Sequence, residues 1–480
     1  MSRPNILVLM ADQLTGTLFP DGPADWLHAP NLKRLAGKSR RFTRAYTASP
    51  LCAPARCSLL TGCLPSHTGV YDNAAEFPAA LPTFLHHLRR GGYHTSLVGK
   101  MDFVGPDQLH GFHERMLAEY DPADFTRTPD WAKPDETPDW WCHDLRSVLA
   151  AGVADASPAI AYDDQVEQLA LARLAELARS DEPWCLVVSF AHLQEPFLAP
   201  QHYWDLYEGC QHLAPAVPAL PWHEHDPHSR RLLTACNYTL HETTADDIAR
   251  ARRAYFASLS LLDGKIGAIL EALEAVASAG TVIVFTSDHG EMLGERGLWF
   301  KMSFREGSAR VPLYLSGPGI EPEREMRPVS TIDIAPTLVE LAGLPPMHCD
   351  GVSLLTEERG PVPMEYAAEG SVAPMVALVE DCWKYTSYPE DPTELFDLDS
   401  DPHELTNLAD LAPGEAARMA AGVEARWNFA TFDRLVRLSQ TRRLLIHAAL
   451  RSDDRYPWEA EPLRLAAERY TQARPPSDTP

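Results

Sequence analysis

The sequence lacks an excess of positive charge. Its 480 residues carry 42 lysines and arginines against 67 aspartates and glutamates, which gives a formal net charge of −25. A protein that binds a nucleic-acid backbone needs a basic face, so we expect no nucleic-acid partner. No apolar run approaches the roughly 18 residues of a membrane span, so we expect no membrane partner. The N-terminal apolar run is too short for a signal peptide, which predicts a cytoplasmic protein.

The cysteines are few, and their spacing does not indicate pairs. The nine cysteines are odd in number and widely scattered, and none forms a C-x-x-C pair. This spacing indicates neither a disulfide framework nor a structural zinc site, and it is typical of a reducing compartment. The hydrophobic share of 45% and the charged share of 23% are those of an ordinary globular protein.

Short apolar runs alternate with helical patterns over most of the chain. The runs that predict buried parallel strands are 6–10, 95–98, 185–190, 281–286 and 312–316, and the helical patterns between them include 82–90, 163–179 and 246–276. Such alternation predicts an α/β fold, a doubly wound and mostly parallel sheet with helices on both faces.

The pattern changes at two places. The stretch 103–158 is rich in proline, tryptophan and aspartate, and we interpret it as a long irregular insertion of the kind that carries function. After about residue 363 a hairpin is predicted at 376–379 and 383–388, followed by helices. We therefore expect a catalytic α/β domain at 1–363 and a C-terminal subdomain with a small antiparallel sheet and a helical tail at 364–480.

Polar residues directly follow four of the predicted strands. They are Asp12; Lys100 and Asp102; His192, Gln194 and Glu195; and Asp288 and His289. Ligands gather beyond the carboxyl ends of strands in an open α/β sheet, so these side chains are candidates for one site. Each one alone could be a helix cap or a solvated loop residue, and Asp288 could cap a helix that starts near Gly290. Asp12, Asp288 and His289 together suit Ca²⁺, Mg²⁺ or Mn²⁺.

The segment SPLCAPARCSLLTG at 49–62 resembles the signature C-x-P-x-R-x-x-x-x-T-G of the type I sulfatases, a family of the alkaline phosphatase superfamily. Its fixed residues here are Cys52, Pro54, Arg56, Thr61 and Gly62. FTSDHGEMLGERGLWFKMSF, DIAPTLVELAGL and ELFDLDSDPHELTNLA are also similar to sulfatase segments. GKMDFVGPDQLHGF, HYWDLY, GSARVPL and YPWEAEP resemble the choline sulfatases in particular. The resemblance implies an alkaline-phosphatase-like fold.

The resemblance also implies roles for individual residues. Cys52 would be converted to formylglycine by a separate formylglycine-generating enzyme, and its hydrated aldehyde would be the nucleophile. Asp12, residue 52, Asp288 and His289 would bind one divalent metal, with Ca²⁺ favoured over Mg²⁺ or Mn²⁺. Arg56 and Lys100 would stabilise the nucleophile, and Lys301 would lie near the leaving-group oxygen. A dication with Lys and Arg suits a sulfate ester, whose transition state spreads negative charge over its oxygens.

Three positions depart from the family pattern. Asp102 stands where the family has a histidine, and it is a weaker base with a reference pKa near ~3.9. Gln194 replaces a histidine that contacts sulfate, and His192 could compensate. Arg127 replaces a tryptophan of the choline pocket, so a cation–π face becomes a cation. Two further pocket positions, Asn73 and His143, match.

Arg127 has two interpretations: an ion pair with a structural acid, or recognition of a neutral or anionic organic group. The leading hypothesis is a formylglycine- and metal-dependent hydrolase of a small anionic sulfate ester, related to choline sulfatase but with altered specificity. One alternative is sulfuryl or sulfamate transfer, or cleavage of a phosphonate or phosphodiester. Another is a non-catalytic ligand-binding relative. The resemblance further implies a homo-oligomer, for which the apolar stretch RRLLIHAAL is a candidate arm.

Overall fold

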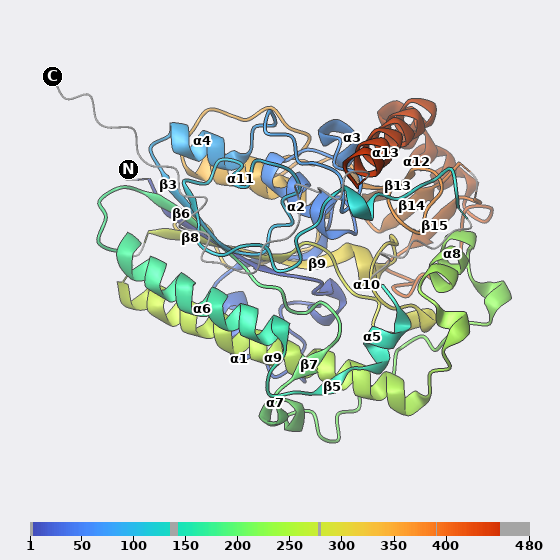
Figure 1. The fold of residues 1–480 in the computed structure, drawn as a ribbon, viewed down its shortest axis with the longest axis horizontal. Coiled ribbons are helices and arrows are strands. Elements are labelled where there is room, and N and C mark those ends of the chain that lie inside the picture. The colour runs from blue at the N-terminus through green and yellow to red at the C-terminus, as the bar shows by residue number, and fades with distance from the viewer. Residues whose placement is uncertain (1–2, 135–142, 277–279, 390, 452–480) are drawn as a thin grey trace.

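The computed structural model describes residues 3–134, 143–276, 280–389 and 391–451. Within them a nine-stranded sheet forms the centre, in the order β10-β2-β9-β8-β1-β6-β3-β4 with β11 beside β2 (Figure 1). The strands are β1 Asn5–Ala11, β2 Arg40–Tyr46, β3 His94–Gly99, β4 Glu114–Arg115, β6 Trp184–Ser189, β8 Thr281–Ser287, β9 Arg310–Ser316, β10 Arg324–Glu325 and β11 Val329–Ser330.

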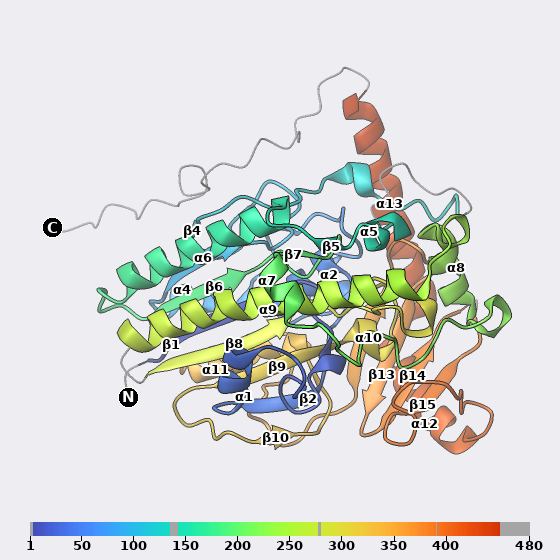
Figure 2. The ribbon, with the colours of Figure 1, turned by 90° about the horizontal axis from the view of Figure 1, so that it is seen from below.

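Helices cover both faces of this sheet (Figures 1 and 2). Strand β1 shows why, because its successive side chains point to opposite faces. Leu7 and Leu9 join the apolar core of one helical layer, and Ile6 and Val8 join the core of the other. The first layer holds α1 Pro30–Ala36, α6 Pro158–Leu177 and α9 Ala245–Val276, and the second holds α2 Cys52–Thr61, α4 Phe84–Arg90 and α11 Ile334–Leu341. A strand buried on both faces is apolar over its buried length, as ILVLMA is after the partly buried Asn5.

The central strands and the main helices confirm the expected α/β fold. Strand β1 lies between β6 and β8 and is parallel to both, and β3 is parallel to β6. The prediction was wrong for 312–316, because β9 runs antiparallel to β2 and β8. Between β8 and β9 there is only a 3₁₀ turn and the four-residue helix α10 Glu306–Ala309, so no crossover helix returns the chain in the parallel sense. Strand β2 was not predicted, because its arginines obscure the apolar alternation.

The C-terminal part is built on a separate antiparallel sheet in the order β12-β13-β14-β15. Its strands are β12 Val362–Tyr366, β13 Met375–Glu380, β14 Trp383–Ser387 and β15 Glu394–Asp397, and helices α12 Pro413–Arg426 and α13 Phe429–Arg451 follow. The pair β13–β14 confirms the predicted hairpin. The division at residue 363 stays a prediction, and it falls inside β12.

The remaining elements are short. They are α3 Pro65–Thr68, α5 Leu145–Leu149, α7 Gln201–Asp205, α8 Pro227–Ala235, the paired strands β5 Gly152–Val153 and β7 Leu198–Ala199, and 3₁₀ turns η1 Gly16–Leu18, η2 Phe125–Arg127, η3 Trp222–Glu224, η4 Tyr238–Leu240, η5 Glu295–Gly297 and η6 Thr331–Asp333. Among the helices of the described ranges, none combines the length and the apolar character needed to cross a bilayer. The YPWEAEP segment at 456–462 lies outside the described residues.

Candidate active site

Three parallel strands are each followed by polar residues that lie at one edge of the sheet. Asp12 follows β1, Lys100 and Asp102 follow β3, and Asp288 and His289 follow β8. Apart from Asp102, which keeps some exposure, these side chains are buried. The structure therefore brings together the residues that strand-end reasoning predicted. No helix follows Asp288 at Gly290, so the interpretation of Asp288 as a helix cap was wrong.

Helix α2 brings Cys52 to the same edge. Cys52 is the first residue of α2, and Arg56 lies four residues later on the same side of the helix. Every residue of α2 is buried, and the helix ends at Gly62, whose positive φ of 69° suits glycine. The Cys52 Sγ atom lies 3.2 Å from His289 Nε2 and 4.0 Å from Lys100 Nζ. Burial raises the pKa of the Cys52 thiol well above its usual range.

Four buried donors fit a single divalent metal. One ligand atom each from Asp12, Cys52, Asp288 and His289 lies within 4.8 Å of all the others. The Asp12 Oδ1 atom is buried and accepts no hydrogen bond from the described residues, as expected of an atom that faces a cation. His289 Nδ1 lies 3.0 Å from the Gly290 carbonyl oxygen and donates to it, which leaves Nε2 as the ligand nitrogen. Burial lowers the pKa of His289 to about 4, so its ring is neutral.

Three cations lie among the carboxylates of this cluster. The Arg56 guanidinium donates from Nε to Asp288 Oδ2 (2.9 Å) and from Nη2 to Asp12 Oδ2 (3.2 Å). Lys100 Nζ also contacts Asp12 Oδ2. Burial opposes ionisation of Asp12, but the charges of Lys100 and Arg56 hold the pKa of its carboxyl well below the usual range. The third cation is Lys301, so a bound dication would give this site a net positive charge.

Asp102 stands between two of these cations. Its Oδ2 atom lies 3.1 Å from Arg56 Nε and 3.5 Å from Lys100 Nζ. The same oxygen is buried and has no hydrogen-bond partner among the described residues. Burial raises the pKa of the Asp102 carboxyl to about 6, although Lys100 and Arg56 act in the opposite direction. A carboxylate with this pKa and a vacant acceptor oxygen can take a proton near neutral pH.

Lys301 is held by a polar network that the sequence did not single out. Its Nζ donates to Gln13 Oε1 (2.6 Å), and Gln13 Nε2 donates to Glu195 Oε2 (2.8 Å) and Glu291 Oε2 (2.5 Å). Gln13 and Glu195 were visible as strand-end residues next to Asp12 and Gln194 but were assigned no role. Glu291 lies two residues after His289, and this closeness to a predicted metal ligand is the sequence feature that could have identified it.

The predicted sulfate-side residues are only partly brought together. Gln194 Oε1 accepts a hydrogen bond from Lys100 Nζ (2.9 Å), so Gln194 lies in the cluster. His192 is instead engaged with Asp163 on α6, at 2.7 Å between Nδ1 and Oδ2. No contact between His192 and Lys100 or Cys52 is seen among the described residues. Its expected compensation for Gln194 therefore has no support in the geometry.

The predicted organic-side residues lie next to this cluster. Asn73 Oδ1 accepts from the backbone N–H of Ala53, beside Cys52 (3.0 Å). His143 Nδ1 lies 2.9 Å from Glu195 Oε1. Glu369 was missed because it comes from the C-terminal part of the chain. Its carboxyl is buried, Oε2 lacks a hydrogen-bond partner among the described residues, and burial raises its pKa to about 7. Trp131 Nε1 donates to the carbonyl of the preceding Ala368 (3.2 Å), which places Glu369 beside the loop that carries Arg127.

The positive charge of Arg127 is balanced by an ion pair. Its two terminal nitrogens donate to both oxygens of Asp121, at 2.6 and 2.7 Å. Burial opposes ionisation of Asp121, but Arg127 and, more weakly, Lys100 and His143 lower the pKa of its carboxyl. The ion pair supplies the acidic partner that the first interpretation of Arg127 requires. It is also compatible with recognition of a neutral group, because the paired side chains still offer hydrogen-bond donors and acceptors.

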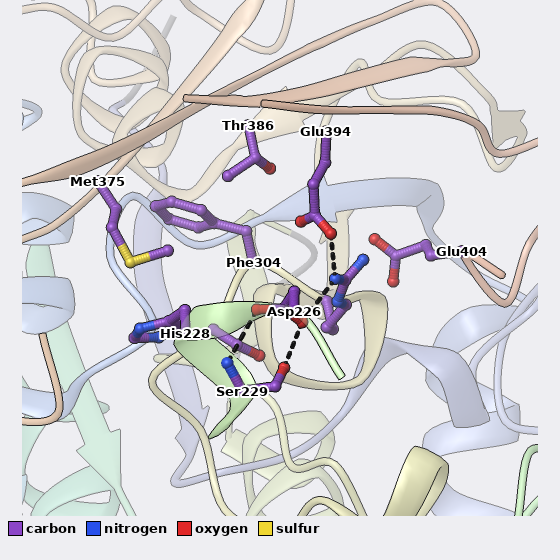
Figure 3. Close-up of a pocket in the computed structure, with 10 residues that line it drawn as sticks. Asp226, His228, Ser229, Phe304, Met375, Thr386, Glu394 and Glu404 are labelled. Atoms are coloured by element: carbon purple, nitrogen blue, oxygen red, sulfur yellow. Dashed lines mark hydrogen bonds and ion pairs between the residues drawn. The ribbon is translucent and has the colours of Figure 1, made fainter. Parts of the chain in front are cut away.

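Arg305 lies four residues after Lys301 and ties this segment to other parts of the chain through ion pairs. Arg305 is buried, and its Nη2 donates to Asp226 Oδ2 (3.0 Å) and Glu394 Oε1 (2.6 Å). Figure 3 shows Asp226 and Glu394 on opposite sides of this contact, with Glu404 close by. Asp226 caps α8 and Glu394 begins β15. Arg305 thus connects the Lys301 segment to the C-terminal sheet.

Comparison with known proteins agrees with this geometry. The profile of the Sulfatase family matches residues 4–344, and the profile described as N-sulphoglucosamine sulphohydrolase, C-terminal, matches residues 294–421. The chain is 52% identical over 497 residues to the choline-sulfatase of Rhizobium meliloti (strain 1021), covering 99% of this chain and 97% of that protein. It is 28% identical over 422 residues to an uncharacterized sulfatase, YidJ, of Escherichia coli (strain K12), covering 85% and 84%.

Solved structures show the same fold. The phosphonate monoester hydrolase of Agrobacterium radiobacter superimposes with a TM-score of 0.69 at 26% identity, covering 88% of this chain and 95% of that chain. A 2-O GAG sulfatase, BT1596, gives a TM-score of 0.67 at 21% identity, covering 88% and 92%. The expected alkaline-phosphatase-like architecture is confirmed.

Proposed function

Because this chain belongs to the sulfatase family and is a sulfuric ester hydrolase, we propose that its reacting group is residue 52, converted from cysteine to formylglycine. The observation that carries this proposal is the place of Cys52, at the start of α2 and within 4.8 Å of three metal-type donors. The hydrated aldehyde supplies a nucleophilic hydroxyl and a second hydroxyl whose deprotonation expels sulfate. A formylglycine-generating enzyme is the partner needed for this conversion.

The metal is proposed to be Ca²⁺, held by Asp12, residue 52, Asp288 and His289. A donor set of two carboxylates and an imidazole also accepts Mg²⁺ or Mn²⁺. When bound, the dication supplies positive charge to the sulfate oxygens. Arg56 fixes the orientation of both carboxylates through its hydrogen bonds to Asp12 and Asp288. The buried position of these groups strengthens every charge interaction at this centre.

Three residues of the chain handle charge and protons in this proposal. Lys100, 4.0 Å from Cys52 Sγ, stabilises negative charge on the nucleophile and the sulfate. Asp102 accepts a proton on Oδ2, which is ion-paired with Arg56 and Lys100 but accepts no hydrogen bond from the described residues. Lys301 donates a proton or a hydrogen bond to the leaving-group oxygen, and Gln13 fixes its position. Gln194 contacts sulfate through its side-chain amide while it accepts from Lys100.

The substrate is proposed to be the sulfate ester of a small neutral molecule, a shift from the choline ester named for the relative from Rhizobium meliloti. A quaternary ammonium is recognised by aromatic faces, and Arg127 with Asp121 replaces such a face by an ion pair. This pair offers hydrogen-bond donors and acceptors instead. Asn73, His143 and Glu369 add further polar groups to the same side of the site.

A substitution of Arg127 tests the specificity. The wild-type protein should hydrolyse the neutral dimethylbutyl isostere of choline sulfate, in which carbon replaces nitrogen, with a higher kcat/KM than choline sulfate. Arg127→Trp should reverse this preference by on the order of tenfold, the value of a desolvated cation–π contact. Arg127→Lys is the matched control and should leave the order unchanged. Preference of the wild-type protein for choline sulfate would disprove the proposed shift.

Compartment and assembly complete the proposal. The cysteines of the described ranges are all free thiols, which supports a reducing, cytoplasmic location. A homo-oligomer is proposed through α13, the helix that contains RRLLIHAAL. Leu445 and Ile446 on this helix are 70% and 43% exposed, so α13 has apolar surface to bury in an interface. Light scattering of the purified protein tests this assembly.

A further inference from the structure

Three side chains of the C-terminal helix α13 form hydrogen bonds with the loops around the candidate active site. Arg437, Gln440 and Arg443 lie at intervals of three residues along the helix, and each contacts one of these loops. Gln440 Oε1 accepts from the backbone N–H of Trp131 (3.1 Å), and Arg437 donates to the Trp131 carbonyl (3.2 Å). Helix α13 also packs against η2, which ends at Arg127.

Arg443 makes the strongest of these contacts. Its side chain is 6% exposed, and it donates from Nη1 to Asp72 Oδ1 (2.7 Å) and from Nη2 to Asp72 Oδ2 (2.6 Å). Nη1 also lies 3.3 Å from the Thr128 hydroxyl. Asp72 is fully buried. One guanidinium therefore joins two loops that are far apart in the sequence.

Each of these loops carries a residue of the organic side of the site. Asp72 precedes Asn73, whose side chain accepts from the N–H of Ala53 next to residue 52. Thr128 follows Arg127, which pairs with Asp121. We propose that Arg443 is a positioning residue for substrate specificity, which holds the Asn73 loop and the Arg127 loop at a fixed separation. The inference rests on the proposed function for the identity of the site, and it adds a residue outside the sulfatase signature.

The geometry requires arginine rather than any cation. Only a planar guanidinium can donate to both oxygens of one carboxylate and still reach a hydroxyl. Removing it leaves the buried Asp72 carboxylate without its counter-charge, so that loop must move or take up a proton. The cluster around residue 52 makes no contact with Arg443 among the described residues. Loss of Arg443 should therefore weaken binding of the organic group of the substrate. The reaction at the sulfate group should stay unchanged.

The first test measures loop positions without using activity. Hydrogen–deuterium exchange of Arg443→Met should rise in peptides that cover 70–75 and 125–131, and it should stay unchanged in peptides of β1 and β8. Asp72→Asn combined with Arg443→Met should restore part of the protection, because no buried charge is then left unpaired. Arg443→Lys carries the same test if the methionine variant does not fold. Unchanged exchange in both loops, or a rise over the whole chain, would overturn the inference.

The second test separates binding from chemistry. For the dimethylbutyl sulfate ester, Arg443→Met should raise KM on the order of tenfold. For para-nitrophenyl sulfate, kcat should change less than twofold. Arg418→Met is the control, because Arg418 on α12 forms exposed ion pairs with Glu415 and with Glu380 of β13 and should alter neither value. An equal fall of kcat for both esters would show a merely structural role. If the wild-type protein cleaves neither ester, the proposed function fails, and the exchange measurement still decides the role of Arg443.

Discussion

The Asp102 carboxylate lies 3.1 Å from the Arg56 guanidinium, and its oxygen there is buried and accepts no hydrogen bond from the described residues. This oxygen is paired with Arg56 and Lys100 by charge only, so it can still accept a hydrogen bond. The proton of a substrate or of a hydrated aldehyde at residue 52 would supply that bond. The departure from the family histidine is therefore compatible with proton transfer at this position.

Replacing Asp102 by asparagine should lower kcat for para-nitrophenyl sulfate about 100-fold, because the amide cannot accept the proton. The pKa of Asp102 is raised to about 6 by burial, so wild-type activity should rise with pH as the carboxyl ionises through this value. A pH–rate profile of both proteins checks this. If the acid limb of the profile persisted in Asp102→Asn, another group would be the base.

Removal of divalent metal should lower both activity and thermal stability. A ligand that binds only the folded state stabilises by about 2.7 kcal/mol at a concentration 100-fold above its Kd, so Ca²⁺ should raise the Tm of the chelator-treated protein. Asp288→Asn should abolish this Ca²⁺-dependent shift. The shift is measured by calorimetry over a range of Ca²⁺ concentrations, and Asp350→Asn on a loop outside the metal cluster is the control. A Tm that does not change with Ca²⁺ concentration would contradict the proposed ligand set.

Glu369 should make the protein less stable at alkaline pH. Burial raises its folded-state pKa from 4.5 to about 7, so the folded state holds a proton that the unfolded chain loses between these values. Its contribution is fully favourable below pH 4.5 and is lost as the pH rises through 7. Glu369→Gln should therefore gain on the order of 1–3 kcal/mol over the wild-type protein at pH 8 and little at pH 5. Denaturant unfolding at both pH values measures this, and an equal difference at both would refute it.

Loss of Arg305 should destabilise the junction between the Lys301 segment and the C-terminal sheet. Arg305→Met removes the shared partner of Asp226 and Glu394, whose side chains are only 18% and 20% exposed, at a cost of roughly 1–3 kcal/mol. Arg418→Met removes only exposed ion pairs and should cost less than about 1 kcal/mol. Chemical denaturation of the two variants makes the comparison. Similar losses would mean that the buried pair network contributes little.

The sequence was sufficient to predict the residues at the strand ends. Buried parallel strands leave continuous apolar runs, and the residues that follow them must meet at one edge. Asp12, Lys100, Asp288 and His289 were found in this way. The signature of α2 added Cys52 and Arg56. The antiparallel direction of β9 could not be read, because a buried run looks the same in either direction.

Contacts between distant segments could not be predicted. The pair of Arg443 and Asp72 is separated by 371 residues, and no periodicity links them. Glu369 reaches the site from beyond the main sheet for the same reason. Arg127 was recognised as a departure, but its partner Asp121 lies in an irregular loop where spacing carries no signal. The organic side of the site is thus the part that needed a structure.

The most direct test of the account is the mass of the peptide that contains residue 52, after expression together with a formylglycine-generating enzyme. The account predicts an aldehyde in place of the thiol, which reacts with hydrazides, together with hydrolysis of para-nitrophenyl sulfate that Cys52→Ala abolishes. An unmodified thiol in a protein that still hydrolyses the ester would contradict the central claim.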